Sequence, residues 1–162
     1  MNNKQKIFLA TVIIIIITVT SISAFTLTTK TPQATKLNTV TTFYPITYLT
    51  QEIGGDRIQV TQLVPSNTEI HSWEPSASHI VAADDADIII YNGGGADHWM
   101  EDDILPALST AKTRTVVDTS TGLTLIANQE HEEVGEDGHE YDPHIWISPY
   151  MAKLQAQNIY TA

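Results

Sequence analysis

Histidine is the residue type in this sequence best suited to chemistry, and it occurs six times in 162 residues. The chain contains no cysteine, so a transition-metal site could be built only from histidine nitrogens and from oxygen ligands such as carboxylates. Two histidines, His71 and His144, lie in segments that also contain tryptophan, proline and an acidic residue. We therefore take metal binding as the first hypothesis for this chain.

The loop PSNTEIHSWEP places His71 shortly after a predicted strand, residues 57–64. In parallel α/β sheets, ligands bind beyond the carboxyl ends of the strands, where the connecting loops converge. The alternative is an ordinary surface histidine, which is the usual state of a single histidine in a loop. The position after a strand favours a functional role for His71, because binding residues are concentrated on such loops.

The segment DPHIWISP constrains His144 more closely. With extended backbone through this segment, Ile145 and Ile147 would anchor it in the core while His144 faces a cleft on the other side. Ser148 could cap a helix whose first residue is Pro149. The alternative is a buried histidine whose ring nitrogens are satisfied by hydrogen bonds.

Two carboxylates close to these histidines in sequence could support a metal site. Asp142, two residues before His144, could accept a hydrogen bond from the ring nitrogen that does not bind metal and thereby fix the tautomer. A solvated position at the end of a loop is the alternative for Asp142. Glu74 could support His71 in the same way, or it could cap a helix that starts near Ser76.

Short β-branched segments alternate with longer helix-like segments from residue 38 onward. The predicted strands are residues 39–43, 57–64, 87–91 and 115–118, and the predicted helices between them are residues 45–53, 76–83 and 98–108. The continuous apolar run DIIIY indicates a strand that is buried on both faces. This alternation predicts an α/β fold with a mainly parallel four-stranded sheet flanked by helices.

The N-terminal residues carry the features of an export signal. Lys4 and Lys6 precede a long apolar run that ends in the small residues of the sequence SISA. We expect residues 1–27 to be a signal peptide cleaved after Ser23. The alternative is an uncleaved signal anchor, since the apolar run approaches the ~20 residues that span a bilayer. Both outcomes place the rest of the chain at the extracellular face of the membrane or in the periplasm, joined through a threonine-rich tether, residues 28–37.

The charge of the chain bears on its partners. The formal net charge is −11, from 19 acidic and 8 basic residues, which favours a cationic ligand. Nucleic acid is not expected as a partner, because phosphate binding needs a clustered positive surface. Part of the negative charge lies in residues 129–141, which also contain His131 and His139. This stretch is either an auxiliary loop that gathers metal weakly or a disordered solubilising insert.

Three segments of the chain together resemble one protein family. They are TTFYPITYLTQEIGGD, HSWEPSASHIVAADDADIIIYNGGG and DPHIWISP, in that order within residues 37–162. These segments are similar to the solute-binding proteins of ABC importers for zinc and manganese, the cluster A-I metal-binding family. Zinc-specific members often carry a histidine-rich acidic loop just before the Asp-Pro-His motif, and residues 129–141 resemble that loop.

The resemblance implies two α/β lobes joined by a long helix, with the metal ion held between the lobes by two ligands from each. Residues 38–148 would form the N-terminal lobe, in which His71 and His144 match ligand positions of the family. Residues 149–162 would begin the inter-lobe helix, and the second lobe is expected to be absent. The implied function is the capture of Zn²⁺ and its delivery to a membrane permease. Mn²⁺ is the alternative cargo and the less favoured one, because manganese prefers more oxygen ligands.

The chain departs from the family pattern in two further places. The family carries an acidic residue shortly after EPS where this chain has His79, for which we expect a structural role. No cysteine for lipid attachment follows the apolar run, so a lipid anchor is not expected.

Two other functions remain open from the sequence. A zinc hydrolase would use His71 and His144 as ligands and Glu74 as base, although the chain has no His-Glu-x-x-His helix. Surface adhesion is a role attached to some family members. The residues neither support nor exclude it.

Overall fold

The computed structural model describes residues 2–28, 35–127 and 141–162. The chain forms two compact units, Met1–Thr35 and Lys36–Ala162.

The first unit contains one long helix, α1 (Asn3–Thr28), whose apolar side chains between Ile7 and Ile17 are largely exposed. Among the described residues, no helix is both long enough and apolar enough to cross a membrane. The export signal expected for residues 1–27 stays a prediction. Most of the predicted tether, residues 29–34, lies outside the described residues, and its last residue, Leu37, already belongs to the first strand.

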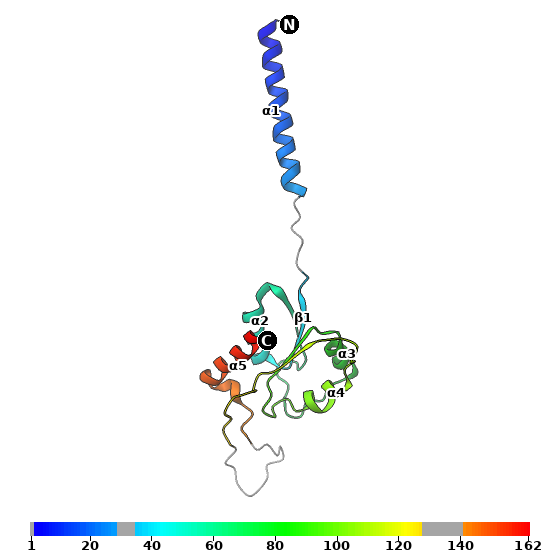
Figure 1. Ribbon diagram of the computed structural model, residues 1–162, viewed down its shortest axis with the longest axis vertical. Coiled ribbons are helices and arrows are strands. Elements are labelled where there is room, and N and C mark those ends of the chain that lie inside the picture. Colours follow the sequence, from blue (N-terminus) through cyan, green and yellow to red (C-terminus); the bar gives the residue numbers. More distant parts are fainter. Residues whose placement is uncertain (1, 29–34, 128–140) are drawn as a thin grey trace. The chain divides into compact units, whose positions relative to one another are not determined.

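The second unit is built on a four-stranded sheet in which every pair of neighbouring strands is parallel (Figure 1). The strand order is β2-β1-β3-β4, so the first and third strands form the centre of the sheet. The predicted α/β fold with a parallel four-stranded sheet is confirmed. The strands are β1 (Leu37–Thr41), β2 (Ile58–Gln62), β3 (Ile88–Tyr91) and β4 (Thr115–Asp118).

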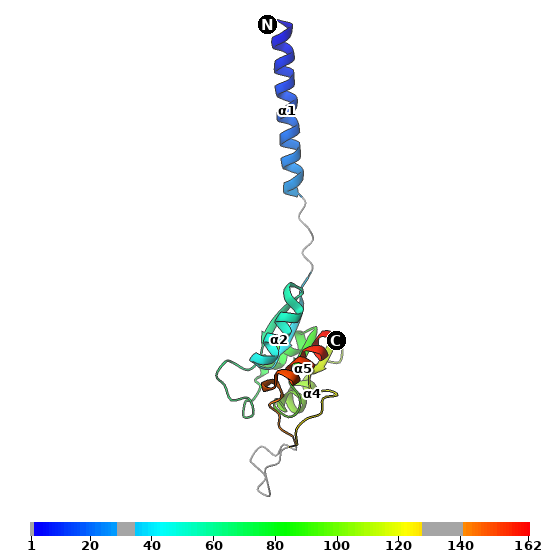
Figure 2. The ribbon, with the colours of Figure 1, turned by 90° about the vertical axis from the view of Figure 1, so that its left-hand side faces the viewer.

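Helices cover both faces of this sheet. Figure 1 shows α2 and α5 together on one face and α3 and α4 on the other, and Figure 2 views the face that α2 and α5 cover. Such two-sided coverage is expected for parallel strands, whose crossover connections carry the helices. The helices are α2 (Tyr44–Gly54), α3 (Ala77–Asp85), α4 (Leu105–Ala107) and α5 (Pro149–Thr161), with shorter 3₁₀ turns η1 (Gly55–Arg57) and η3 (Ile145–Ile147) and a π-helical turn η2 (Met100–Ile104).

Local sequence explains where these helices begin and end. Helix α2 has Pro45 in its first turn and ends before Gly55, whose φ of 53° lies in the region that glycine adopts readily. Helix α5 begins at Pro149, as predicted. Ser148 caps it, with its hydroxyl oxygen 3.5 Å from the backbone N–H of Met151.

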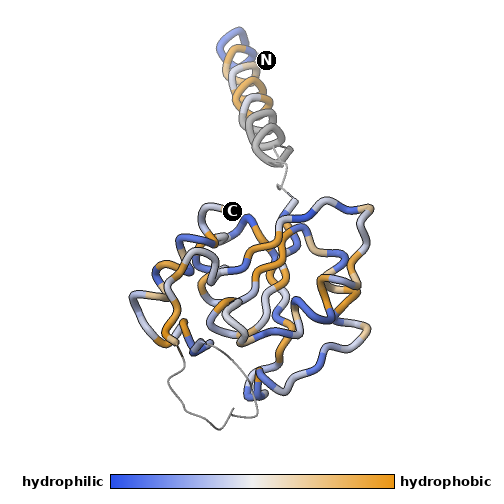
Figure 3. The backbone as a smooth tube through the Cα atoms, turned by 60° about the horizontal axis from the view of Figure 1, so that its bottom comes forward, coloured by the Kyte–Doolittle hydropathy of each residue, from blue (hydrophilic) through white to orange (hydrophobic). Residues whose placement is uncertain are grey.

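The core lies between the sheet and its helices. Ile46 of α2, Ile89 of β3 and Met100 of η2 are fully buried, and Trp99 is 1% exposed. Figure 3 shows the hydrophobic stretches gathered in the central strands of this unit. The sheet is therefore filled by packed side chains. A ligand-binding site is expected in the loops that follow the carboxyl ends of its strands.

Candidate metal centre

His71 lies in the loop between β2 and α3, as the sequence predicted, and it is half-buried. Its backbone N–H donates to Oε1 of Glu69 at 3.2 Å. The carbonyl of the preceding residue, Ile70, accepts a hydrogen bond from Nε1 of Trp99 at 3.2 Å. The side chains of Glu69 and Trp99 therefore hold the loop backbone at the histidine and at the residue before it.

His144 lies at the start of η3, and the extended backbone predicted for this segment is wrong. Asp142 Oδ1 accepts the backbone N–H of His144 at 2.9 Å, which turns the chain and competes with a strand. The turn continues as η3, with the N–H of Ile147 donating to the carbonyl of His144 at 3.2 Å. Ile145 is accordingly buried at 6% exposure, whereas Ile147 is 69% exposed and anchors nothing.

The ring of His144 is oriented on two sides. Its Nδ1 lies 2.8 Å from Oδ1 of Asp142, the geometry predicted for a supporting carboxylate. The backbone hydrogen bond from His144 and then the ring hydrogen bond hold the pKa of Asp142 below its ordinary value, so this carboxylate is ionised at neutral pH. An ionised acceptor favours the proton on Nδ1, which leaves the lone pair on Nε2.

Trp146 supports the other side of the same ring. Its ring centroid lies 5.3 Å from that of His144 and 4.8 Å from that of Phe43, a buried residue at the start of α2. Sequence reasoning did not identify Phe43 as part of the site. The only available signal was its place directly after the first strand.

The structure brings His71 and His144 together although 73 positions separate them in the chain. The two Nε2 atoms lie 3.3 Å apart, and the ring centroids lie 5.2 Å apart with an interplanar angle of 72°. Two histidine nitrogens on one tetrahedral Zn²⁺, each at about 2.0–2.1 Å, would be separated by about 3.3–3.4 Å. The geometry of this pair therefore fits two ligands of a single zinc ion.

The pair is incomplete as a zinc shell. Within the described parts of the chain, no group of three or more histidine or acidic residues could hold a metal ion. His131 and His139, the predicted auxiliary residues, lie outside the described residues. A closed tetrahedral site needs four ligands, so the described residues of this unit offer half of one.

Glu74 and His79 were also singled out from the sequence. Glu74 is exposed, and its support of His71 stays a prediction. His79 caps α3, since its Nδ1 accepts the backbone N–H of Ser76 at 3.0 Å, and its ring packs on Trp73 at 4.9 Å between centroids. This is the structural role expected of His79.

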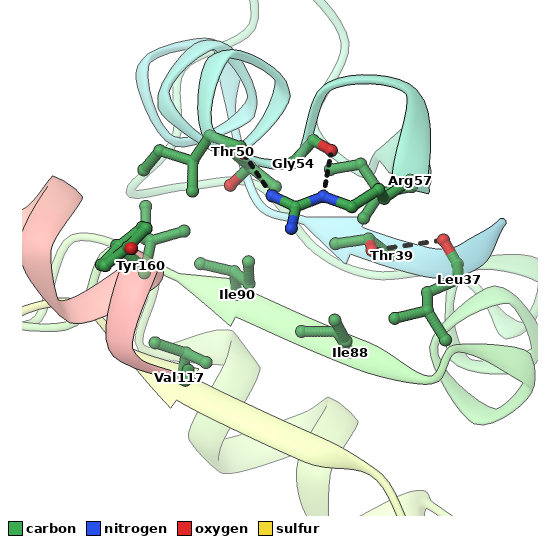
Figure 4. A pocket seen from close by; sticks show the side chains of 13 residues that line it. Leu37, Thr39, Thr50, Gly54, Arg57, Ile88, Ile90, Val117 and Tyr160 are labelled. Atoms are coloured by element: carbon green, nitrogen blue, oxygen red, sulfur yellow. Dashed lines mark hydrogen bonds between the residues drawn. The ribbon is translucent and has the colours of Figure 1, made fainter.

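A pocket of about 420 Å³ opens at the opposite edge of the sheet (Figure 4). Its walls include Leu37 and Ile88, the first residues of β1 and β3, together with Tyr160 near the end of α5. The guanidinium of Arg57 borders it and donates to the carbonyls of Gly54 and Ile53, at 3.3 and 3.1 Å. The histidine pair follows the carboxyl ends of the strands, so this pocket is not part of the histidine site.

The parallel sheet and the paired histidines beyond its carboxyl edge define an α/β domain with a candidate transition-metal site. Comparison with known proteins agrees with that class. The model of the family described as "ZnuA: Zinc-uptake complex component A periplasmic" matches residues 39–162. The chain therefore belongs to this zinc-uptake family, and the resemblance inferred from its three segments is confirmed.

Individual relatives agree with this assignment. The "Zinc-binding lipoprotein AdcA" of Streptococcus pneumoniae is 38% identical over 129 residues, and the "High-affinity zinc uptake system protein ZnuA" of Bacillus subtilis is 35% identical over 131 residues. The crystal structure of Zn(II)-bound AdcA from Streptococcus pneumoniae matches with a TM-score of 0.65 at 32% identity and covers 77% of this chain. The matches cover 76% of this chain but only 26% of the AdcA sequence and 40% of the ZnuA sequence. The chain thus spans well under half of either relative.

Proposed function

We propose that this chain is the N-terminal lobe of an exported solute-binding protein, which captures Zn²⁺ and delivers it to the membrane permease of an ABC importer. The observation that carries the proposal is the 3.3 Å separation of the Nε2 atoms of His71 and His144. Membership of the zinc-uptake family supports the same function. Export rests on the N-terminal sequence and on the lipoprotein or periplasmic descriptions of the family and its members.

Zinc is the preferred cargo in this proposal, and Mn²⁺ is the alternative. Both ligands offered by this lobe are imidazole nitrogens, which suit zinc, whereas Mn²⁺ favours carboxylate, carbonyl and water oxygens. The two histidines leave at least two positions of a tetrahedral zinc ion to water, so tight binding requires further ligands.

Direct measurement of Zn²⁺ binding to the chain tests the site. Replacing His71 or His144 with alanine should weaken binding at least about 10-fold, because each change removes a ligand and not merely a neighbour of one. His79→Ala is the matched control, since it removes an imidazole that caps α3. Competition with a chromogenic chelator gives the affinities. Binding that survives both ligand substitutions would refute the assignment.

The acidic stretch and the enzyme alternative can be separated from the histidine pair. Deleting residues 129–140 from a full-length form should lower zinc uptake only when zinc is scarce, if the stretch is auxiliary. Loss of tight binding would instead show that it supplies a ligand.

Zinc-dependent turnover of a chromogenic ester would support a hydrolase, whereas zinc binding without turnover favours transport.

A further inference from the structure

The glycine-rich segment NGGGADHW, residues 92–99, follows β3 and has no role in the proposal so far. Asp97 closes it into a turn: its Oδ2 accepts the N–H of Asn92 at 2.7 Å and its Oδ1 accepts the N–H of Gly93 at 3.0 Å. Three consecutive glycines at its centre adopt φ values of 73°, 62° and 92°, which other residues rarely adopt. Asn92 and Asp97 are 0% and 1% exposed, so the hydrogen bonds that close the turn are buried.

The two ends of this turn bind the backbone next to the two histidines. Asn92 donates from Nδ2 to the carbonyl of Pro143 at 3.2 Å, and Pro143 directly precedes His144. Trp99 donates from Nε1 to the carbonyl of Ile70 at 3.2 Å, and Ile70 directly precedes His71. Each bond therefore fixes the peptide from which a histidine side chain starts.

Both donors are themselves fixed by the core. Asn92 Oδ1 accepts from Nε2 of Gln155 on α5 at 2.9 Å, and the Asn92 carbonyl accepts from the hydroxyl of Thr119 at 2.9 Å. The Trp99 ring packs edge-on against Trp73 with 4.4 Å between ring centroids, and only 1% of Trp99 is exposed. Neither donor can move without disturbing the contacts that hold it.

We propose that residues 92–99 form a template that sets the separation of His71 and His144, with Asn92 and Trp99 as its two positioning residues. The inference rests on the proposed zinc-binding function of the histidine pair. Neither positioning residue contacts the other histidine's loop in the bonds described, so each controls one side of the pair. A metal site requires its ligands to be held within about 0.5 Å, which two loops 73 positions apart do not achieve without a common support.

Two substitutions with matched controls test this template. Asn92→Asp keeps an oxygen for Gln155 but removes the donor to Pro143. Asn158→Asp is its control, because Asn158 also donates to two backbone carbonyls, those of Thr119 and Thr121, at 3.0 and 2.9 Å.

Trp99→Phe keeps an aromatic ring but removes the donor to Ile70. Tyr91→Phe is its control, because it removes a hydroxyl that donates to Glu101 at 2.9 Å from the same buried region. Two independent pairs keep the test decisive if one variant fails to fold.

Three measurements on the whole chain separate the outcomes: the nuclear Overhauser contact between the His71 and His144 rings without metal, the affinity for Zn²⁺, and the urea midpoint of unfolding. We expect Asn92→Asp and Trp99→Phe to lose the ring contact and to weaken zinc binding about 10- to 100-fold. The control variants should keep the ring contact and should bind zinc within about twofold of the unaltered chain, even where their urea midpoints fall as far as those of the test variants.

The template is overturned if the ring contact persists in both variants and their zinc affinity falls no further than that of the controls. If the unaltered chain shows the ring contact but binds no zinc, the proposed function fails. The ring contact in the variants then still decides whether residues 92–99 position the pair.

Discussion

At the scale of single residues, Asp142 combines two tasks in one oxygen. Oδ1 accepts a hydrogen bond from the backbone N–H of His144 at 2.9 Å, and this bond forms the turn. The same oxygen lies 2.8 Å from Nδ1 of the His144 ring, and this second bond orients the imidazole. The side chain of Asp142 is 50% exposed, so its hydrogen bond with the ring contributes little to folding stability. Its effect should be seen in metal affinity instead.

Asp142→Asn should weaken Zn²⁺ binding by about 10-fold or more, because a neutral amide is a poorer acceptor for the Nδ1 proton and leaves the tautomer less defined. Titration against a competing chelator measures the change. Asp118→Asn is the matched control: Asp118 Oδ1 accepts the backbone N–H and hydroxyl of Ser120, two residues on, at 2.8 and 2.7 Å, and touches neither histidine in these bonds. Equal affinity in the two variants would show that Asp142 only shapes the turn.

At the scale of elements, the sequence predicted the strands well and the irregular helices poorly. The strand 115–118 agrees residue for residue with β4, and the last three residues of DIIIY are buried as expected, because apolar β-branched runs report burial directly. The predicted helix 98–108 instead contains a π turn, since Leu105 N–H bonds to the carbonyl of Met100 and Pro106 has no N–H for the next bond. In η3, the side chain of Asp142 overrode a pattern that is typical of a strand.

The turn η3 predicts unequal costs for two isoleucines that a strand would bury alike. Ile145→Ala should destabilise the chain by about 2–5 kcal/mol, because it empties a packed position at 6% exposure. Ile147→Ala should cost no more than about 0.5 kcal/mol, since Ile147 is 69% exposed. Urea unfolding of both variants gives these free energies. Similar losses of unfolding free energy at the two positions would instead support the extended conformation.

At the scale of the whole molecule, the position of the histidine pair could be predicted but its distance could not. The sequence placed His71 in a loop after a strand and His144 on an extended segment, and the family resemblance paired them. Their approach to 3.3 Å depends on the strand order β2-β1-β3-β4 and, in our proposal, on the turn of residues 92–99. Neither feature leaves a periodic signal in the sequence. Asn92 and Trp99 were missed for the same reason.

The division into two units predicts that residues 36–162 fold without residues 1–35. The shorter chain should keep its free energy of unfolding within about 0.5 kcal/mol and its zinc affinity unchanged. Urea unfolding and chelator competition check both. A chain that starts at residue 39 is the control and should be less stable, because Asn38 donates its N–H to Asp87 Oδ2 at 2.9 Å and Leu37 pairs with Ile58 in the sheet. A lower midpoint for residues 36–162 would show that the first unit stabilises the second.

The partial exposure of His144, 44% for its side chain, has a kinetic consequence. A zinc ion on the histidine pair would keep water molecules in its coordination shell, and an incoming ligand could replace one of them before either histidine departs. Exchange would then proceed without any unfolding of residues 36–162, and the residence time of the ion would depend on the concentration of competing ligands in the surrounding fluid. Such stepwise replacement is how an open half-site can pass an ion onward without releasing it as the free hydrated cation.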